Sequence, residues 1–375
     1  NRLGGQITLN PKLNSFEWEA NNFRLDRVEL AFPPEKSFKR IFGEVSGKGI
    51  FSPDPLFING ELTLDYFRLL GFKLKQANIK GQIKDSETNL TAKLIPSKNG
   101  KIKLDINKGS EISLLAQLQN VSSTWIAATA LEMPKLGLKY SEAIGKAEDL
   151  VELIIGYPNS SIDTQLVALN KSKDSYREEI TKINNKSIIN PYDLNGNVNA
   201  DISLSGQSLS DLKLEAKASG KVWSSKLNAI NTKDIRPFNV TFNGNIGAGF
   251  GSFSLLDLNF SLLSLVAPMP SAINGYFGLN GKYSLIDGSP KVTADLIIKD
   301  TIIDDRNIIL DKGNILFKDN YLEFDIALRD KSSTNPVKLS GTYPLISSYP
   351  IDLKIESHGD GLAFLTGITK GNVSW

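Results

Sequence analysis

The chain has 375 residues, 41% of them hydrophobic, and its 43 basic and 41 acidic residues leave a net charge of +2. Nucleic-acid binding needs clustered lysine and arginine, so this balanced charge predicts no nucleic-acid partner. The chain has no cysteine and one histidine, His358, which excludes a disulfide framework and argues against a multi-histidine metal site or a Ser-His-Asp triad. The most apolar run, residues 255–270, is interrupted by Asp257 and Asn259 and does not predict a membrane-spanning helix.

Residues 1–120 predict a first array of short β-strands. Apolar and polar residues alternate in segments such as 62–66 and 102–106, which gives each strand one apolar and one polar face. Turn signals recur about every ten residues, which is the spacing of an all-β sheet. Two of these signals are Asn59-Gly60, which we interpret as a turn leading into a strand, and Asn99-Gly100.

The pattern changes in residues 121–190, where we expect a helical insertion, centred on residues 121–185. Ser122 or Ser123 can cap a first short helix, and Pro134 ends it. A longer helix is predicted by six apolar residues on one helical face: Ile162, Leu166, Leu169, Tyr176, Ile180 and Ile183. We expect this face to pack on a sheet; a lid over an apolar groove or a contact with a membrane surface is the alternative.

Strand patterns resume at Tyr192, so residues 191–375 form a second predicted strand array. Its clearest part is residues 276–345, where apolar residues occupy every second position of segments such as 292–298 and 322–328. Turn signals, among them Asp311-Lys312-Gly313 and Asp304-Asp305, punctuate the array.

Two short motifs suggest chemistry, and each has a simpler interpretation. Residues 357–361 bring Ser357, His358 and Asp360 together, but triad partners are usually far apart in sequence, so the two glycines favour a tight turn. Residues 193–201 are similar to a calcium loop, but the glycine stands at the fourth place and Leu204 replaces the final glutamate. The sequence therefore predicts no enzyme, no metal site and no cofactor.

Strands laid edge to edge over most of this length form a very wide antiparallel sheet, which must curl, split or close. An elongated, curled sheet would leave its apolar face lining a groove. Each aliphatic side chain left in water forfeits about 1.5–3 kcal/mol, so an open groove needs an apolar occupant, such as lipid acyl chains or a partner strand. A closed barrel or a sandwich would bury the same face internally.

Several segments resemble the repeats of TamB proteins, of the wider AsmA-like group, and the resemblance covers most of residues 40–120 and 193–375. The motifs support the resemblance mainly because they recur along the chain. Some of them are similar to sequences of the cyanobacterial and plastid branch of the family. The segments are INGELTL (58–64), residues 253–270 followed by Gly275, Gly278 and Gly281, LDKGNILF (310–317), YLEFD (321–325) and ESHGDGLAFLTG (356–367). The helical insertion departs from a plain repeat.

The resemblance implies a non-enzymatic protein of the cell envelope. TamB-like proteins are anchored in the inner membrane, cross the periplasm and form a taco-shaped β-sheet with an apolar inner surface. The resemblance therefore implies an elongated, curled antiparallel sheet, a β-taco, with one continuous groove. TamB-like proteins support phospholipid transport and, with an Omp85-class partner, assembly of outer-membrane proteins. The chain begins at Asn1 without an initiator methionine, so we interpret it as an internal part whose inner-membrane anchor lies elsewhere. Nine apolar residues match the family pattern, and we expect them to face the groove: Val292, Leu296, Ile298, Ile315, Phe317, Leu322, Phe324, Ile326 and Leu328.

Two other functions fit an all-β chain. A structural or adhesive β-solenoid would have a dry, sealed core of valine, isoleucine and leucine. A polysaccharide-acting enzyme would have a cleft with paired carboxylates and aromatic platforms. The acidic residues of the predicted strands mostly alternate onto the polar face, which argues against the enzyme.

Overall fold

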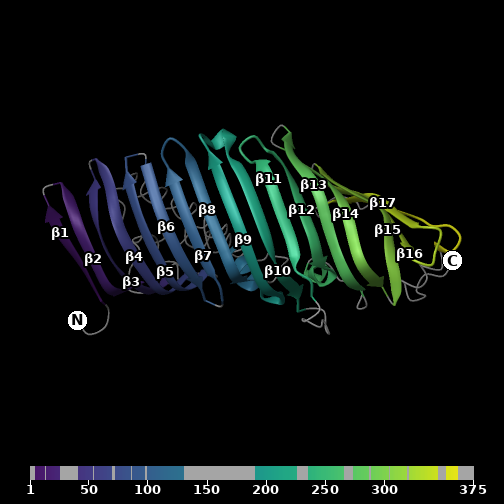
Figure 1. Ribbon diagram of the computed structural model, residues 1–375, viewed down its shortest axis with the longest axis horizontal. Helices are drawn as coiled ribbons and strands as arrows, with labels where there is room; N and C mark the ends of the chain where they lie inside the picture. The colour runs from purple at the N-terminus through teal and green to yellow at the C-terminus, as the bar shows by residue number, and fades with distance from the viewer. Residues whose placement is uncertain are drawn as a thin grey trace, which may run out of the picture. The chain divides into compact units, whose positions relative to one another are not determined.

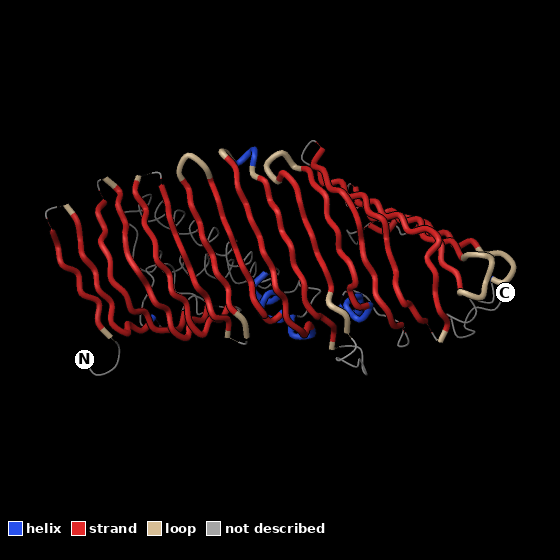
Figure 2. The backbone as a smooth tube through the Cα atoms, viewed as in Figure 1, coloured by secondary structure: helices blue, strands red, loops and turns tan. Residues whose placement is uncertain are grey.

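The structure, a computed structural model, contains an 18-stranded antiparallel sheet, which confirms the predicted mostly-β fold (Figure 1, Figure 2). It describes residues 5–12, 14–25, 41–53, 55–69, 72–85, 87–97, 99–130, 191–225, 235–265, 273–286, 289–303, 305–318, 321–344 and 352–361. The chain divides into two compact units, residues 1–102 with 121–192 and residues 103–120 with 193–375. Within the described ranges, no helix combines the length and the hydrophobicity that crossing a membrane requires.

The first unit contains a meander in which each strand pairs antiparallel with the next. Its strands are β1 (Gln6–Lys12), β2 (Ser15–Arg24), β3 (Ile41–Pro53), β4 (Leu56–Leu69), β5 (Phe72–Lys84) and β6 (Glu87–Pro96). Charges alternate across its polar face: Lys48 pairs with Glu19 on one side and with Glu61 on the other. Opposite charges at paired positions stabilise the register.

The second unit continues the same hairpin pattern, and each strand from β9 to β18 pairs antiparallel with the next. The strands are β7 (Lys101–Lys108), β8 (Ile112–Ser122), β9 (Leu194–Gly206), β10 (Lys213–Ser224), β11 (Phe238–Asn245), β12 (Phe250–Asn259), β13 (Ile273–Ile286), β14 (Ser289–Ile303), β15 (Arg306–Lys318), β16 (Tyr321–Asp330), β17 (Val337–Pro344) and β18 (Asp352–Glu356). Three short 3₁₀ helices accompany these strands: η3 (Pro191–Asp193), η4 (Leu209–Asp211) and η5 (Phe260–Leu265).

Two of the predicted turns are wrong, because both segments lie inside strands. Asn59-Gly60 lies within β4, and Asp311-Lys312-Gly313 lies within β15. In β15 the pairing with β16 shifts between Leu310 and Lys312, so the turn-like residues form a β-bulge instead of reversing the chain. The predicted turn at Asp304-Asp305 is confirmed at Asp305, which has a φ of 65° between β14 and β15.

Three neighbouring strands of the second unit carry irregular positions close together. The pairing of β12 shifts between Leu255 and Leu258, and that of β13 shifts beside Gly275, whose φ is 113°. In β14, Asp300 has a φ of 47°. Bulges bend strands and increase their twist, so these positions mark a bend that crosses β12, β13 and β14.

Two ion pairs and a ring contact fix this bend. Lys299 Nζ lies 2.8 Å from an Asp257 carboxylate oxygen, and Arg236 Nη1 lies 2.7 Å from Asp300 Oδ2. The Arg236 guanidinium also lies 5.1 Å from the centre of the Tyr276 ring. The backbone N–H of Arg236 donates to the Tyr276 hydroxyl at 3.1 Å. Specific side-chain partners therefore hold the irregular residues in place, and the bulges are regular features of this fold.

The packed core of the first unit includes the start of the predicted insertion. Residues 123–130 are helical, which confirms the first short helix, and Trp125 packs its ring 5.5 Å from that of Phe72. Trp125 Nε1 donates to the carbonyl of Lys73 at 2.6 Å, while Val121 and Ala77 are fully buried. The rest of the predicted insertion, including the stripe that contains Leu166, lies outside the described residues.

Candidate functional site

One face of the second unit's sheet is apolar along a row that crosses every strand from β9 to β18. Paired residues on neighbouring strands point to the same face; Ile315, for example, pairs with Ala294 on one side and Phe324 on the other. The row, called the central apolar row below, consists of Ile202, Ala216, Phe242, Phe253, Gly281, Ala294, Ile315, Phe324, Gly341 and Leu353.

The structure places all nine predicted groove residues on this apolar face. Ile315 and Phe324 belong to the central apolar row, and the others lie in the flanking rows two or more residues away along the strands. All nine side chains are half-buried. The register therefore brings them together on one surface, while their contact with lipid remains a prediction.

Two of the nine residues also belong to a packed cluster near the bend. Ile298 and Leu328 contact the core pair Ile308 and Val337, which are 6% and 2% exposed. This cluster stabilises the sheet where its strands bend. The apolar face thus has a packed part near the bend and a half-exposed part around the central apolar row.

The apolar rows remain exposed at the last strand of the described sheet. Leu353 of β18 ends the central apolar row and is 54% exposed, and Ile355, two residues further along, is 47% exposed. Neighbouring Tyr343 of β17 is 48% exposed. Single exposed apolar residues are common, but these three continue rows that cross the whole unit.

Aromatic rings on the apolar face lie over glycines of neighbouring strands. A methyl group at Gly281 would come within 2.6 Å of Phe253 Cζ, and one at Gly251 within 2.5 Å of Tyr283 Cε1. The Tyr283 ring also stacks on Phe242 with ring centres 5.5 Å apart. We did not predict these pairs, because a glycine in a strand pattern gives no information about which ring covers it until the register is known.

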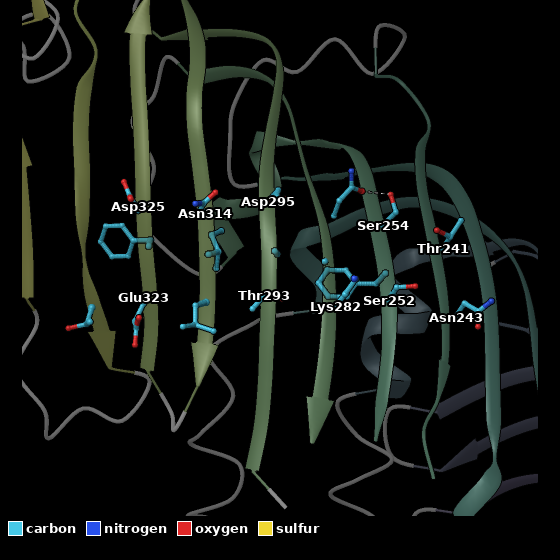
Figure 3. Close-up of a pocket in the computed structure, with 18 of the residues that line it drawn as sticks. Thr241, Asn243, Ser252, Ser254, Lys282, Thr293, Asp295, Asn314, Glu323 and Asp325 are labelled. Carbon is cyan, nitrogen blue, oxygen red and sulfur yellow. Dashed lines mark hydrogen bonds between the residues drawn. The ribbon is translucent and has the colours of Figure 1, made fainter. Parts of the chain in front are cut away.

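A hollow of about 990 Å³ lies on the opposite, polar face of the second unit (Figure 3). Thr293, Ala294 and Asp295 of β14 line it, but the next residues on either side, Val292 and Leu296, do not. Since successive residues of a strand point to opposite faces, the walls of the hollow are the polar side chains, and the strand backbone is its floor.

Cross-strand contacts join the polar walls of this hollow. Ser254 Oγ donates to Asn280 Oδ1 at 2.6 Å, and Lys312 pairs with the Asp325 carboxylate. Figure 3 shows Asp295, Asn314 and Asp325 side by side on three neighbouring strands. These partners give the polar face a structural role, in keeping with the predicted division between the two faces.

The segment 357–361 is a turn that clasps the loop between β16 and β17. Gly361 N–H donates to the His358 carbonyl at 3.0 Å, which confirms the predicted tight turn. The Asp360 carboxylate accepts hydrogen bonds from the backbone N–H of Thr334 at 2.9 Å and from Asn335 Nδ2 at 2.8 Å. These donors, the Thr334 N–H foremost, hold the pKa of Asp360 well below its usual range. Asp360 thus serves as an anchor for the turn.

The side chains of the loop-like segment 193–201 hold neighbouring strands together. Asn199 Oδ1 accepts the backbone N–H of Asn120 at 2.8 Å, and Asp201 Oδ1 accepts from Gln117 Nε2 at 3.4 Å. Both bonds join β8 to β9. The simpler interpretation of this segment, a turn that leads into a strand, is wrong for residues 194–201, because they lie within β9; only Asp193, the last residue of η3, precedes the strand.

The chain matches no protein-family model, no curated protein and no solved structure. What its geometry offers is a broad sheet face of half-exposed aliphatic and aromatic side chains, backed by a polar face with satisfied cross-strand partners. Such a face binds apolar ligands by burial of surface rather than by directional bonds.

Proposed function

We propose that this chain is a non-enzymatic segment of a TamB-like, envelope-spanning protein. Its apolar sheet face holds phospholipid acyl chains as they move between the inner and outer membranes. It also supports assembly of outer-membrane proteins, together with an Omp85-class partner. The segment lies in the periplasm, and a part of the protein outside this chain anchors it in the inner membrane. The observation that carries the proposal is the central apolar row, which runs across ten successive strands, β9 to β18, and whose larger side chains are half-buried or exposed.

The energetics favour an apolar occupant for this face. Full burial of an aliphatic or aromatic side chain yields about 1.5–3 kcal/mol, and half-buried residues such as Phe324 and Ile326 realise only part of it. The unrealised part is available to a ligand that covers the row. Acyl chains suit the row because they carry no polar group that would need a partner.

The alternative function, a structural or adhesive β-solenoid with a sealed core, has less support. The described strands pair as antiparallel hairpins, whereas the coils of a β-helix stack in parallel. A sealed core would also bury the large apolar residues at the end of the row, where Leu353 is 54% exposed.

Photocrosslinking from two adjacent residues tests the proposal directly. Phe324 lies on the apolar face and Glu323 on the polar face of the same strand. Photoreactive residues at these two positions therefore differ mainly in the face of the sheet that they sample. After expression in a bacterial envelope, the variant at position 324 should crosslink to phospholipid and the variant at 323 should not. Equal lipid yields, or crosslinks from 324 only to neighbouring strands of the chain, would refute the open face.

A further inference from the structure

A second hollow, of about 840 Å³, adjoins the first on the polar face of the second unit. The two hollows share four polar residues of the successive strands β11 to β14, all labelled in Figure 3: Asn243, Ser252, Lys282 and Thr293. The second hollow extends from these residues to Phe250. We call it the Phe250 hollow.

The Phe250 hollow has an aromatic ring in polar surroundings. Phe250 lies two residues from Ser252 on β12, so both side chains point to the polar face, and it pairs with Asn245 and Ser284 of the neighbouring strands. It is 56% exposed and makes no ring contact with another described residue. Full burial of such a side chain yields about 1.5–3 kcal/mol, part of which is unrealised here. The ring therefore offers a platform to a ligand that has an apolar surface of its own.

Three lysines line the same hollow, and none of them has an acidic residue as its cross-strand partner. Their partners are serine, threonine, asparagine or another lysine. The three are Lys213, Lys282 and Lys291, and within the described ranges none of them forms an ion pair. Elsewhere on this face a lysine meets a carboxylate, as Lys312 does with Asp325. The lysines of the Phe250 hollow are thus available to an anionic ligand.

The register concentrates positive charge at one end of the hollow. Lys291 stands directly opposite Lys318, and like charges at paired positions destabilise a sheet. Lys282 and Lys291 are diagonal neighbours on β13 and β14, a separation of about 7–8 Å that one anionic group can bridge. Glu215 is the single acidic residue among the described residues that line the hollow, so its net charge is positive. An anion bound here would relieve the repulsion between the lysines.

We infer that the Phe250 hollow binds an anionic saccharide. The apolar side of one sugar ring covers the phenyl ring of Phe250, and a carboxylate of the sugar lies between Lys282 and Lys291. Sugar hydroxyls both donate and accept hydrogen bonds, which suits the amide of Asn245 and the hydroxyl of Ser284 beside the ring. The site lies on the face opposite the central apolar row, so the inference does not depend on lipid carriage and adds a second binding function to the sheet.

Calorimetric titration of the whole chain tests the inference. The probe is an oligosaccharide of uronic acid, and a neutral glucose oligosaccharide of the same length is the comparison. The uronate should bind roughly tenfold more tightly than the neutral sugar. Its affinity should also fall as salt is added, because exposed lysines supply part of the attraction and salt screens them.

Single substitutions separate the platform from the charges. Phe250→Ala removes an exposed ring, so the chain should fold and bind the uronate roughly tenfold more weakly. Lys282→Gln combined with Lys291→Gln should remove the preference for the uronate over the neutral sugar. Lys338→Gln is the matched control, because Lys338 lies on the polar face of β17 outside the hollow, and it should leave the affinity unchanged.

The outcomes distinguish this site from other uses of the same charges and from the proposed function. Uronate binding that both changes weaken and Lys338→Gln does not supports the saccharide site. Inorganic phosphate or an acidic peptide that binds as tightly as the uronate would overturn it in favour of a general anion site, and so would an unaltered affinity in Phe250→Ala. Failure of both oligosaccharides to bind would also overturn it. The lipid content of Phe250→Ala should equal that of the wild type, so loss of the saccharide site leaves lipid carriage testable on its own.

Discussion

An arginine placed on the apolar face distinguishes an open surface from a sealed core. Ile326 is half-buried beside the central apolar row, while Ile308 is 6% exposed in the cluster near the bend. In Ile326→Arg, the long side chain can lie along the face while its guanidinium reaches water. In Ile308→Arg, the charge starts from a packed position, and the carboxylate paired with it in register, that of Asp330, already lies near Arg306.

The magnitudes follow from burial. Ile308→Arg should lower the free energy of unfolding by about 3–5 kcal/mol, because it forces a long charged side chain into the packed apolar cluster. Ile326→Arg forfeits only about half of the transfer free energy of an isoleucine, so we expect a loss of about 1–1.5 kcal/mol. Ser340→Arg, on the polar face opposite Asp325, should stay within about 0.5 kcal/mol of the wild type.

The assay pairs stability with lipid content. Urea unfolding gives the free energies, and mass spectrometry of the purified variants gives the bound phospholipid. We expect Ile326→Arg to fold with reduced lipid and Ser340→Arg to fold with normal lipid. If Ile326→Arg cost as much stability as Ile308→Arg, the face would be sealed and the reasoning refuted.

Three further predictions concern single contacts. Gly49→Ala should lose about 1–3 kcal/mol of stability in urea unfolding, because its methyl group would meet the Asn59 carbonyl oxygen at 2.5 Å and Trp18 Nε1 at 2.7 Å; an unchanged midpoint would contradict this close packing. The Thr334 N–H lowers the pKa of Asp360 in the folded protein. The contribution of Asp360 to the free energy of unfolding is therefore complete above the ordinary carboxylate pKa and is lost as pH falls through the pKa of the folded state. Acid titration should therefore show a steeper loss of stability in the wild type than in Asp360→Asn, and equal slopes would count against the clasp. Trp125→Phe removes a buried hydrogen bond and should lower the unfolding free energy by about 1–3 kcal/mol, measured in the same way.

The fold could be predicted from alternation because strand period is a local property. Every second residue of segments 292–298 and 322–328 is apolar, and both segments lie in strands, β14 and β16. The two wrong turns show the limit of local signals. Asp311-Lys312-Gly313 has turn chemistry, but pairing with β16 on one side keeps the segment extended, with a bulge in place of a reversal.

The candidate site was predictable in part, for a related reason. Alternation assigns Val292 and Phe324 to an apolar face, but it does not tell which strands bend or which rows meet. The packing of Leu328 on Val337 and the ring of Trp18 over Gly49 depend on register between strands, which residue types alone do not fix. The positive φ angles of Asp257 and Asp300 could not be predicted from the sequence either, because such backbone conformations usually belong to glycine.

Glycines on the apolar face let aromatic rings of neighbouring strands pack directly against the backbone. Valines at Gly49 and Gly281 would raise strand propensity, yet the chain retains glycines under Trp18 and Phe253. Filling those positions would displace the rings, so these glycines contribute to the stability of the sheet. The packed cluster of Ile308 and Val337 lies near the bend at Asp257 and Asp300. This cluster does not cover the rest of the central apolar row. Packing is thus concentrated near the bend, and most large apolar side chains of the central apolar row are half-buried among the described residues, which is compatible with the proposed carriage of acyl chains.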